Sequence, residues 1–373
     1  MTTSVSSASV AKLSDWLISP RNRVAYRRAA EIFPSRRVTS RGAPPLIRAI
    51  DPGVLTSVRT DYLERSFTDA FVVLQNSKLV AEWYAPGMYA DTRHILFSVT
   101  KSVIGMVATN LIVDRVLDER ELVSAVVPES SVGGYGSATV RDLLDMTANI
   151  DFTEEYDGPD VHRYRIASGQ IQSAKKSADG IHEYIAGLRQ AGPHGSAHRY
   201  VSPTADMLGW VCERATNSSL AELISRYVWC PMGAEHDADL LVDSKGAARA
   251  SGGLCATASD MARIGQLLLD SEGANRRDRV GADIRRPGDR AAWSRGGVAS
   301  FIPNGAYRSM WYQLGGAPGR YLAAGIYGQR IYVDMPRRVV IAQQGSSPSA
   351  EHETWVETVP LFEAISGEVS RDS

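Results

Sequence analysis

The stretch HILFSVTKSVIGMVATNLIV, His94 to Val113, carries the strongest structural signal in the chain. Its apolar residues recur at spacings of three and four, which predicts a buried helix. Ser98 and Lys101 lie one turn apart near the start of that helix, where they share a face. Because a buried helix normally excludes lysine, Lys101 is a candidate for chemistry rather than for packing.

A serine hydroxyl becomes a strong nucleophile only when a base removes its proton. Burial lowers the pKa of a lysine because it penalises the ammonium, so a buried lysine one turn away can be that base. A helix that begins at the serine also directs free backbone N–H groups at a developing anion. The sequence therefore predicts Ser98 as the nucleophile, Lys101 as the base, and the Ser98 N–H as half of an oxyanion hole.

The Ser-x-x-Lys pattern is weak evidence by itself, because it occurs three times in the chain. Ser9 with Lys12 and Ser173 with Lys176 lie in polar segments that cannot bury a lysine. Only the pair at 98 and 101 opens an apolar helix directly after two predicted strands. The alternative is a serine that caps the helix beside a lysine whose charged end reaches solvent. Both interpretations stay open on these residues alone.

The rest of the chain predicts an α+β fold. The segment 68–84, TDAFVVLQNSKLVAEWY, has two β-branched runs around a polar turn, and four short runs after Gly305 predict an antiparallel meander. We expect them to form one antiparallel sheet of five or six strands, flanked by helices, with a mostly helical domain inserted. The expected parts are an extended N-terminal arm (1–50), a sheet domain (51–113 and 301–373) and a helical domain with substrate loops (114–300), with the active site between the two domains.

Composition narrows the classes of partner. The formal net charge is −1 and the basic residues are dispersed, which argues against nucleic acid or an anionic membrane as a partner. No apolar run is long enough to span a membrane, and no secretory signal pattern is present, so we expect a cytoplasmic protein. Cys212, Cys230 and Cys255 form no CxxC pair and are expected to be reduced core residues. The histidines have no metal-ligand spacing, so neither a metal nor another cofactor is expected.

HILFSVTKSVIG, together with the preceding TDAFVVLQNSKLVAEWYAPG, resembles the penicillin-recognising serine hydrolases. These include class C β-lactamases, D-alanyl-D-alanine peptidases and related esterases. Within that superfamily the chain is most similar to the 6-aminohexanoate-dimer hydrolases, which are nylon-oligomer amidases. The similarity runs from about Thr68 to Trp355. It implies a β-lactamase/DD-peptidase-like fold and an acyl-enzyme on Ser98.

The resemblance assigns further site residues. The family's second motif, a tyrosine followed two residues later by Asn or Ser, matches Tyr200-Val201-Ser202. It implies that Tyr200 relays protons and that Ser202 lies in the substrate site. Tyr156 matches a loop tyrosine that contacts the nitrogen of the scissile amide, which favours amide substrates. Near the C-terminus, Thr354 replaces a histidine that lines the family's pocket.

The third motif departs from that of the β-lactamases, which carry Lys-Thr-Gly on a strand beside the site. The corresponding strand here is Gly325-Ile326-Tyr327-Gly328-Gln329, and nylon-oligomer hydrolases typically have Gly-Ile-His-Gly-Gln. Tyr327 therefore replaces a histidine and is expected in the substrate site. The resemblance implies that a backbone N–H of Ile326 or of Gln329 completes the oxyanion hole, and the sequence does not choose between them.

These observations predict a serine hydrolase that acts on a small amide or ester. An acyltransferase would use the same acyl-enzyme with an amine acceptor, and that alternative stays open. A β-lactamase is less favoured because the lysine of the third motif is missing. A non-catalytic binding protein is less favoured because Ser98, Lys101 and Tyr200 are all present. A homodimer is a possible assembly, since related enzymes are often dimers.

Overall fold

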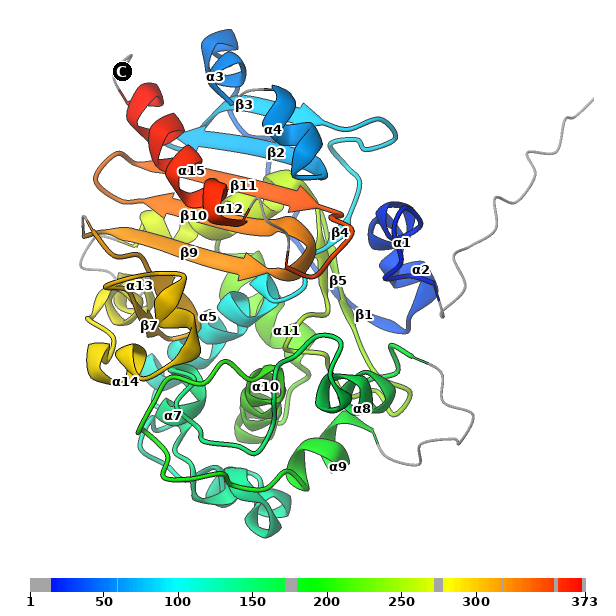
Figure 1. The fold of residues 1–373 in the computed structure, drawn as a ribbon, viewed down its shortest axis with the longest axis vertical. Helices are drawn as coiled ribbons and strands as arrows, with labels where there is room; N and C mark the ends of the chain where they lie inside the picture. The colour runs from blue at the N-terminus through cyan, green and yellow to red at the C-terminus, as the bar shows by residue number, and fades with distance from the viewer. Residues whose placement is uncertain are drawn as a thin grey trace, which may run out of the picture.

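The computed structural model describes residues 15–58, 60–171, 180–271, 278–316, 318–351 and 355–370. Its frame is an antiparallel sheet of seven strands in the order β3-β2-β11-β10-β9-β8-β7 (Figure 1). Segments far apart in the sequence meet in this sheet, since Val73 lies opposite Ile341. The strands are β2 (Thr68–Gln75), β3 (Lys78–Tyr84), β7 (Ala306–Arg308), β8 (Trp311–Gln313), β9 (Arg320–Gly325), β10 (Gln329–Asp334) and β11 (Val339–Gly345).

The sheet has more strands than the five or six expected, because the run around Trp311 folds back on itself. Ser309 and Met310 have positive φ angles of 47° and 65°. Such angles are typical of the tight turns that join hairpin strands. β7 and β8 therefore pair with each other, with Tyr307 opposite Tyr312.

Helices cover the sheet and also form a region of their own beside it (Figure 1). The longer ones are α5 (Val99–Val113), α8 (Pro159–Ala167), α10 (Ser202–Thr216), α12 (Ala258–Leu269), α13 (Asp278–Arg285) and α15 (Trp355–Val369). The shorter ones are α1 (Asn22–Arg27), α2 (Ala29–Ile32), α3 (Pro52–Ser57), α4 (Thr60–Arg65), α6 (Val123–Val126), α7 (Val140–Leu144), α9 (Ile181–Ala186), α11 (Leu220–Ile224) and α14 (Arg290–Ser294). Within the described ranges, no helix is both long enough and apolar enough to cross a membrane.

The two faces of the sheet are covered by different helices, since neighbouring residues of a strand point to opposite faces. Tyr332 of β10 packs against Phe362 of α15, with ring centroids 6.0 Å apart. On the other face, a Cβ on Gly265 of α12 would lie 2.8 Å from the side chain of Ile331. A glycine at this position therefore allows α12 to lie directly against the sheet.

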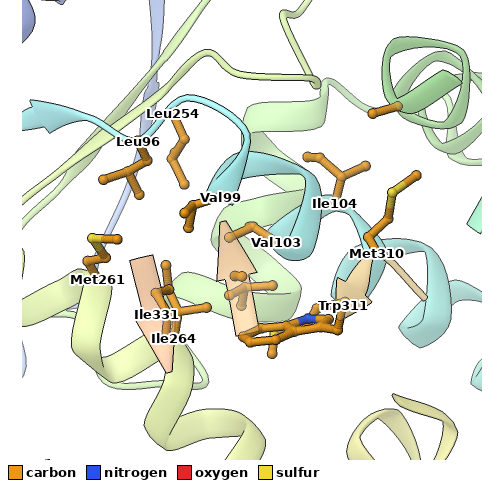
Figure 2. Close-up of a cluster of buried hydrophobic side chains, with 14 of the residues drawn as sticks. Leu96, Val99, Val103, Ile104, Leu254, Met261, Ile264, Met310, Trp311 and Ile331 are labelled. Carbon is orange, nitrogen blue, oxygen red and sulfur yellow. The ribbon is translucent and has the colours of Figure 1, made fainter. Parts of the chain in front are cut away.

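Helix α5 is buried along nearly its whole length. Figure 2 shows Val99, Val103 and Ile104 of α5 among apolar side chains from the sheet and from α12. Gly105 faces the β7–β8 turn, where a Cβ would lie only 2.3 Å from the carbonyl oxygen of Ser309. This packing fixes the position of the helix N-terminus, where Ser98 lies.

The segment expected to form a helical domain, residues 114–300, is not helical throughout. Helices α7, α9 and α11 pack against α10, and α11 also packs against α5. A second sheet, in the order β1-β5-β6-β4, takes two of its strands from this segment. Helix α12 also belongs to the segment but packs on the main sheet. The periodicity of the sequence could not show where α12 packs, because an amphipathic helix has the same spacing of apolar residues in either domain. The strands of the second sheet are β1 (Ser35–Val38), β4 (His94–Ile95), β5 (Ala238–Leu241) and β6 (Leu254–Ala256).

The expected extended arm at residues 1–50 is wrong for the part described from residue 15 onwards. That part forms α1, α2 and β1. Trp16 and Tyr26 are buried, and their ring centroids lie 5.9 Å and 4.9 Å from that of Phe97. Arg23 Nε lies 2.8 Å from Asp69 Oδ1 in an ion pair. This ion pair helps to hold the segment against the sheet domain.

Candidate active site

Ser98 and Lys101 meet at the N-terminus of α5. Phe97 has a positive φ of 43°, and this turn brings Ser98 to the start of the helix. Lys101 Nζ lies 2.6 Å from Ser98 Oγ and donates to Ser251 O at 2.8 Å. It also lies 3.2 Å from the hydroxyl of Ser202. The lysine side chain thus joins Ser98 to two other segments of the chain.

The environment of Lys101 favours a neutral amine more than solvent does. The residue is 1% exposed. Burial lowers the pKa of Lys101 to about 8, although the charges of Glu154 and Asp206 oppose the shift. About a tenth of Lys101 is therefore unprotonated at pH 7, a far larger share than for a lysine in solvent, and this neutral amine can accept a proton from Ser98 across the 2.6 Å contact.

Tyr200 lies beside this pair. Its ring centroid is 4.9 Å from Lys101 Nζ, and its ring stacks on that of Tyr312 at 6.3 Å. Burial raises the pKa of Tyr200, and a hydrogen bond with Ser98 only partly opposes that shift. The phenol is therefore protonated at neutral pH and can donate a proton beside Ser98.

Glu154 is a site residue that the sequence analysis missed. It accepts hydrogen bonds from Ser202 N at 2.8 Å and from Ser202 Oγ at 2.5 Å. Burial raises the pKa of Glu154, and the charge of Lys101 opposes the rise. Glu154 therefore orients the Ser202 hydroxyl and supplies an acidic group close to Lys101. The sequence offered one signal for Glu154, namely its position two residues before Tyr156. Glu154 itself belongs to no motif.

A buried cluster behind Lys101 fixes the carbonyl that Lys101 binds. Asp206 accepts a hydrogen bond from Ser251 N at 2.8 Å and another from the Tyr164 phenol. The Tyr164 oxygen also lies 2.5 Å from Ser251 Oγ. Burial raises the pKa of Asp206 to about 6. These contacts hold Ser251, whose carbonyl oxygen in turn holds the lysine.

The end of β9 approaches the backbone of Ser98. A Cβ on Gly325 would lie 2.7 Å from Leu96 O and 3.0 Å from Ser98 N, so the two backbones touch at this glycine. Ile326 follows and lines the cavity next to Ser98. Arg330 Nη1 donates to Gly325 O at 2.5 Å, and Gly325 O belongs to the same peptide unit as the Ile326 N–H. A cationic side chain thus fixes the orientation of that peptide.

The structure separates the other two residues predicted on this strand from the cavity. The Gln329 side chain is fully buried and donates to Gly345 O at 2.7 Å, so it joins two strands. Tyr327 has a positive φ of 61°, which turns its side chain towards Tyr26 and Phe97 at centroid distances of 5.3 Å and 5.2 Å. Neither residue lines a cavity beside Ser98. The structure therefore places Tyr327, which was expected in the substrate site, in the cluster with Tyr26 and Phe97 instead of on a cavity wall.

A cavity of ≈730 Å³ opens in front of Ser98 and Tyr200. Its wall includes Tyr156, as expected, and the aromatic rings of Phe152 and Tyr312. Thr354, which was expected in the pocket, lies outside the described residues. The charged residues on the cavity wall are Glu154, Arg199, Arg295, Arg330 and Glu351.

Arg330 supplies a cation that the sequence analysis did not expect. It lies on β10, the strand after the one that would carry the missing lysine, and it is 7% exposed. Burial lowers the pKa of Arg330 to about 10, so the guanidinium stays charged at neutral pH. Ser202, the remaining predicted residue, contacts both Lys101 and Glu154 but lines a second, smaller cavity.

Comparison with known proteins agrees with this arrangement. The family model described as Beta-lactamase matches residues 61–350. A 6-aminohexanoate-dimer hydrolase of Paenarthrobacter ureafaciens is 32% identical over 354 residues, which cover 92% of this chain and 90% of that protein.

Solved structures share the fold. The one named "Putative 6-aminohexanoate-dimer hydrolase from Bacillus anthracis" superposes with a TM-score of 0.87 at 24% identity and covers 99% of each chain. EstCE1, a hydrolase with promiscuous acyltransferase activity, has a TM-score of 0.65 at 17% identity and covers 84% of this chain and 98% of its own. At these identities the two structures establish a likeness of fold alone.

Proposed function

The chain belongs to the beta-lactamase family, and from that premise we propose that it is a serine hydrolase of a small amide or ester, acting through an acyl-enzyme on Ser98. The observation that carries the proposal is the 2.6 Å contact between Lys101 Nζ and Ser98 Oγ at the wall of the large cavity. The relative at 32% identity is named for hydrolysis of 6-aminohexanoate dimer, which supports an amide as the substrate.

The proposed reaction uses the groups around Ser98 in two steps. Neutral Lys101 accepts the Ser98 proton as Oγ attacks the carbonyl carbon, and the resulting oxyanion accepts hydrogen bonds from the N–H groups of Ser98 and Ile326. Tyr200 donates its proton to the leaving nitrogen or oxygen and regains one from Lys101. Water then attacks the acyl-enzyme, gives its proton to the same pair, and releases the carboxylic acid and free Ser98.

Ile326 is proposed over Gln329 as the second oxyanion donor. Ile326 lines the cavity with Ser98, whereas Gln329 does not. The contact of Arg330 Nη1 with Gly325 O supports the same choice, because it polarises the peptide that ends in the Ile326 N–H.

Acyl transfer to an amine is the second candidate. The cavity of ≈730 Å³ leaves room for an acceptor beside a short acyl chain. The test is product analysis with p-nitrophenyl butyrate in the presence of increasing n-butylamine. A butyramide yield that rises with amine, above the yield from the uncatalysed reaction, supports transfer. Butyrate as the enzymatic product at every amine concentration supports hydrolysis.

The acyl-enzyme is tested by intact mass measurement after brief exposure to p-nitrophenyl butyrate and an acid quench. We expect one butyryl adduct on the wild type and none on Ser98→Ala. Ser131→Ala is the matched control, because it removes an exposed serine that is distant in sequence from the residues lining the cavity. This variant should retain the adduct. Equal release of p-nitrophenol by the wild type and Ser98→Ala, without an adduct, would contradict the assignment of the nucleophile.

A further inference from the structure

Two residues with the same uncommon backbone conformation lie next to the two proposed oxyanion donors. Phe97, which precedes Ser98, has a φ of 43°, and Tyr327, which follows Ile326, has a φ of 61°. A residue with a Cβ seldom adopts a positive φ, because its side chain then crowds the backbone, and it stays there only when surrounding contacts hold it. The backbone at Ser98 and at Ile326 therefore depends on what holds Phe97 and Tyr327.

The side chains of Phe97 and Tyr327 meet in one buried aromatic cluster, and their ring centroids lie 5.2 Å apart. Tyr26 of α1 contacts both rings, with centroid distances of 4.9 Å to Phe97 and 5.3 Å to Tyr327. Trp16 stacks on Phe97 from the same N-terminal segment. Tyr26 is fully buried, so its ring has fixed neighbours on every side. One residue thus packs against both of the positions with positive φ.

Polar contacts fix α1, and with it Tyr26, in this position. Asn22 Nδ2 donates to Ser347 O at 2.9 Å, and Ser347 N donates to Tyr327 O at 3.2 Å. The ion pair between Arg23 and Asp69 joins α1 to the first strand of the main sheet. Figure 1 shows α1 beside β4, the strand that ends two residues before Phe97. The N-terminal segment is therefore held independently of its aromatic rings.

The cluster acts on a part of the oxyanion hole that the contact of Arg330 does not reach. Arg330 holds Gly325 O, in the peptide before Ile326, whereas Tyr26 packs against Tyr327, the residue after it. Ile326 itself is partly buried and packs against the cluster. The proposed donor is thus fixed from both of its neighbours in the chain.

We propose that Tyr26 is a positioning residue of the active site, which holds Phe97 and Tyr327 so that the N–H groups of Ser98 and Ile326 point at one oxyanion. Tyr26 lines neither cavity beside Ser98, so it acts through these two residues and not on the substrate. Hydrogen-bond donors stabilise a developing anion best when their direction is fixed before the charge forms. The inference rests on the proposed function and adds the N-terminal segment to its machinery.

The test uses n-butylboronic acid as a probe of the oxyanion hole. Ser98 Oγ adds to the trigonal boron, the Ser98 proton passes to Lys101, and a boron-bound oxygen of the tetrahedral adduct takes the place of the oxyanion. The inhibition constant therefore reports on the two N–H donors without any departure of a leaving group. It is measured beside kcat/KM for p-nitrophenyl butyrate, at a temperature below the unfolding of every variant.

Tyr26→Leu removes the ring between Phe97 and Tyr327. It should raise the inhibition constant of n-butylboronic acid and lower kcat/KM by similar factors of about 10–10². Tyr26→Phe keeps the ring, so both quantities should stay within about threefold of the wild type. The acid limb of the pH profile should not move in either variant, since Lys101 and Tyr200 are intact.

Phe362→Leu is the matched control for a general loss of rigidity. Phe362 is also fully buried, but its ring packs against Tyr332 in the main core. This variant should lower the midpoint of thermal unfolding and leave the inhibition constant of the boronic acid unchanged. If Tyr26→Leu does not fold, Trp16→Leu takes its place, because it removes the ring stacked on Phe97.

Two results would overturn the inference and leave the proposed function in place. One is a folded Tyr26→Leu enzyme that binds the boronic acid as tightly as the wild type does. The other is an equal loss of boronic acid affinity in Phe362→Leu, which would assign the effect to general destabilisation. A wild type that neither binds the boronic acid nor is acylated on Ser98 by p-nitrophenyl butyrate would remove the proposed function, and the inference with it.

Discussion

On one side of Ser98 the structure places titratable side chains, and on the other side it places backbone. Lys101, Tyr200 and Glu154 lie on the first side, linked through hydrogen bonds to Ser98 or Ser202. On the second side, β9 ends at Gly325, whose backbone touches that of Ser98. The first side is suited to move protons, and the second side is suited to stabilise an oxyanion with N–H groups.

This difference predicts two kinds of sensitivity. The side-chain half depends on protonation states, so substitutions there should change the pH dependence of the reaction. On the backbone side the titratable group in contact is Arg330, which stays charged at neutral pH, so displacement of the strand rather than a change of protonation should harm it. The four predictions below test this contrast, from the largest expected effect to the smallest.

Lys101→Met should lower kcat/KM for p-nitrophenyl butyrate by about 10³–10⁴-fold, because it removes the general base and keeps a side chain of similar length. The measurement is steady-state kinetics with far-UV circular dichroism to establish folding. Lys78→Met, at an exposed position in β3, is the matched control and should match the wild type. A folded Lys101→Met enzyme with activity within tenfold of wild type would remove Lys101 as the base.

Gly325→Val should lower kcat by about 10²–10³-fold with a smaller change in KM, because the added side chain pushes β9 away from Ser98 N and displaces an oxyanion donor. The shape of the pH profile should stay that of the wild type, since Lys101 and Tyr200 are intact. Gly187→Ala is the control, because its Cβ would meet nothing closer than 3.6 Å. A shifted acid limb in Gly325→Val would contradict the division between the two sides.

Tyr200→Phe should lower kcat about 10²-fold for an amide substrate and less for a p-nitrophenyl ester. An amine leaves only after protonation, whereas p-nitrophenolate leaves unaided. The measurement is the ratio of the two losses, with butyryl p-nitroanilide as the amide. Equal losses on both substrates would indicate that Tyr200 acts before the leaving group departs.

Glu154→Gln should move the acid limb of the kcat/KM profile to lower pH, with less than a tenfold change at the plateau. Wild-type activity should rise as pH passes through about 8, where Lys101 loses its proton. The charge of Glu154 raises the pKa of Lys101, so its removal lowers that pKa and lets neutral lysine persist at lower pH. A shift to higher pH would show that Glu154 acts on Lys101 in another way.

The sequence predicted the parts of the site whose geometry is local. Ser98 and Lys101 are one helical turn apart, so their contact follows from the helix alone. Glu154 could not be predicted, because its position in the site depends on contact with Ser202, a distant residue. Tyr327 occupied the expected position in the strand, but a single positive φ angle turned it into another cluster. Local spacing determined the first pair, and tertiary packing determined the others.

The same distinction applies to the fold. The hairpin at 68–84 and the C-terminal meander were predicted from alternation and turn residues, and both are present. The assignment of residues 15–50 to an arm failed because burial of Trp16 and Tyr26 depends on Phe97, which lies far along the chain. Composition describes a segment in isolation and carries no information about such a partner.

The pairing of β2 with β11 has a consequence for synthesis of the chain. β2 leaves the ribosome long before its partner, since Val73 lies opposite Ile341. Helix α5, with Ser98 and Lys101, also emerges before the strand that brings Ile326. Pairings over such sequence separations form late, because a long loop must close first. A nascent chain therefore carries Ser98 and Lys101 before Ile326 is in place, and on the proposed mechanism it becomes active only after β9, β10 and β11 have been released.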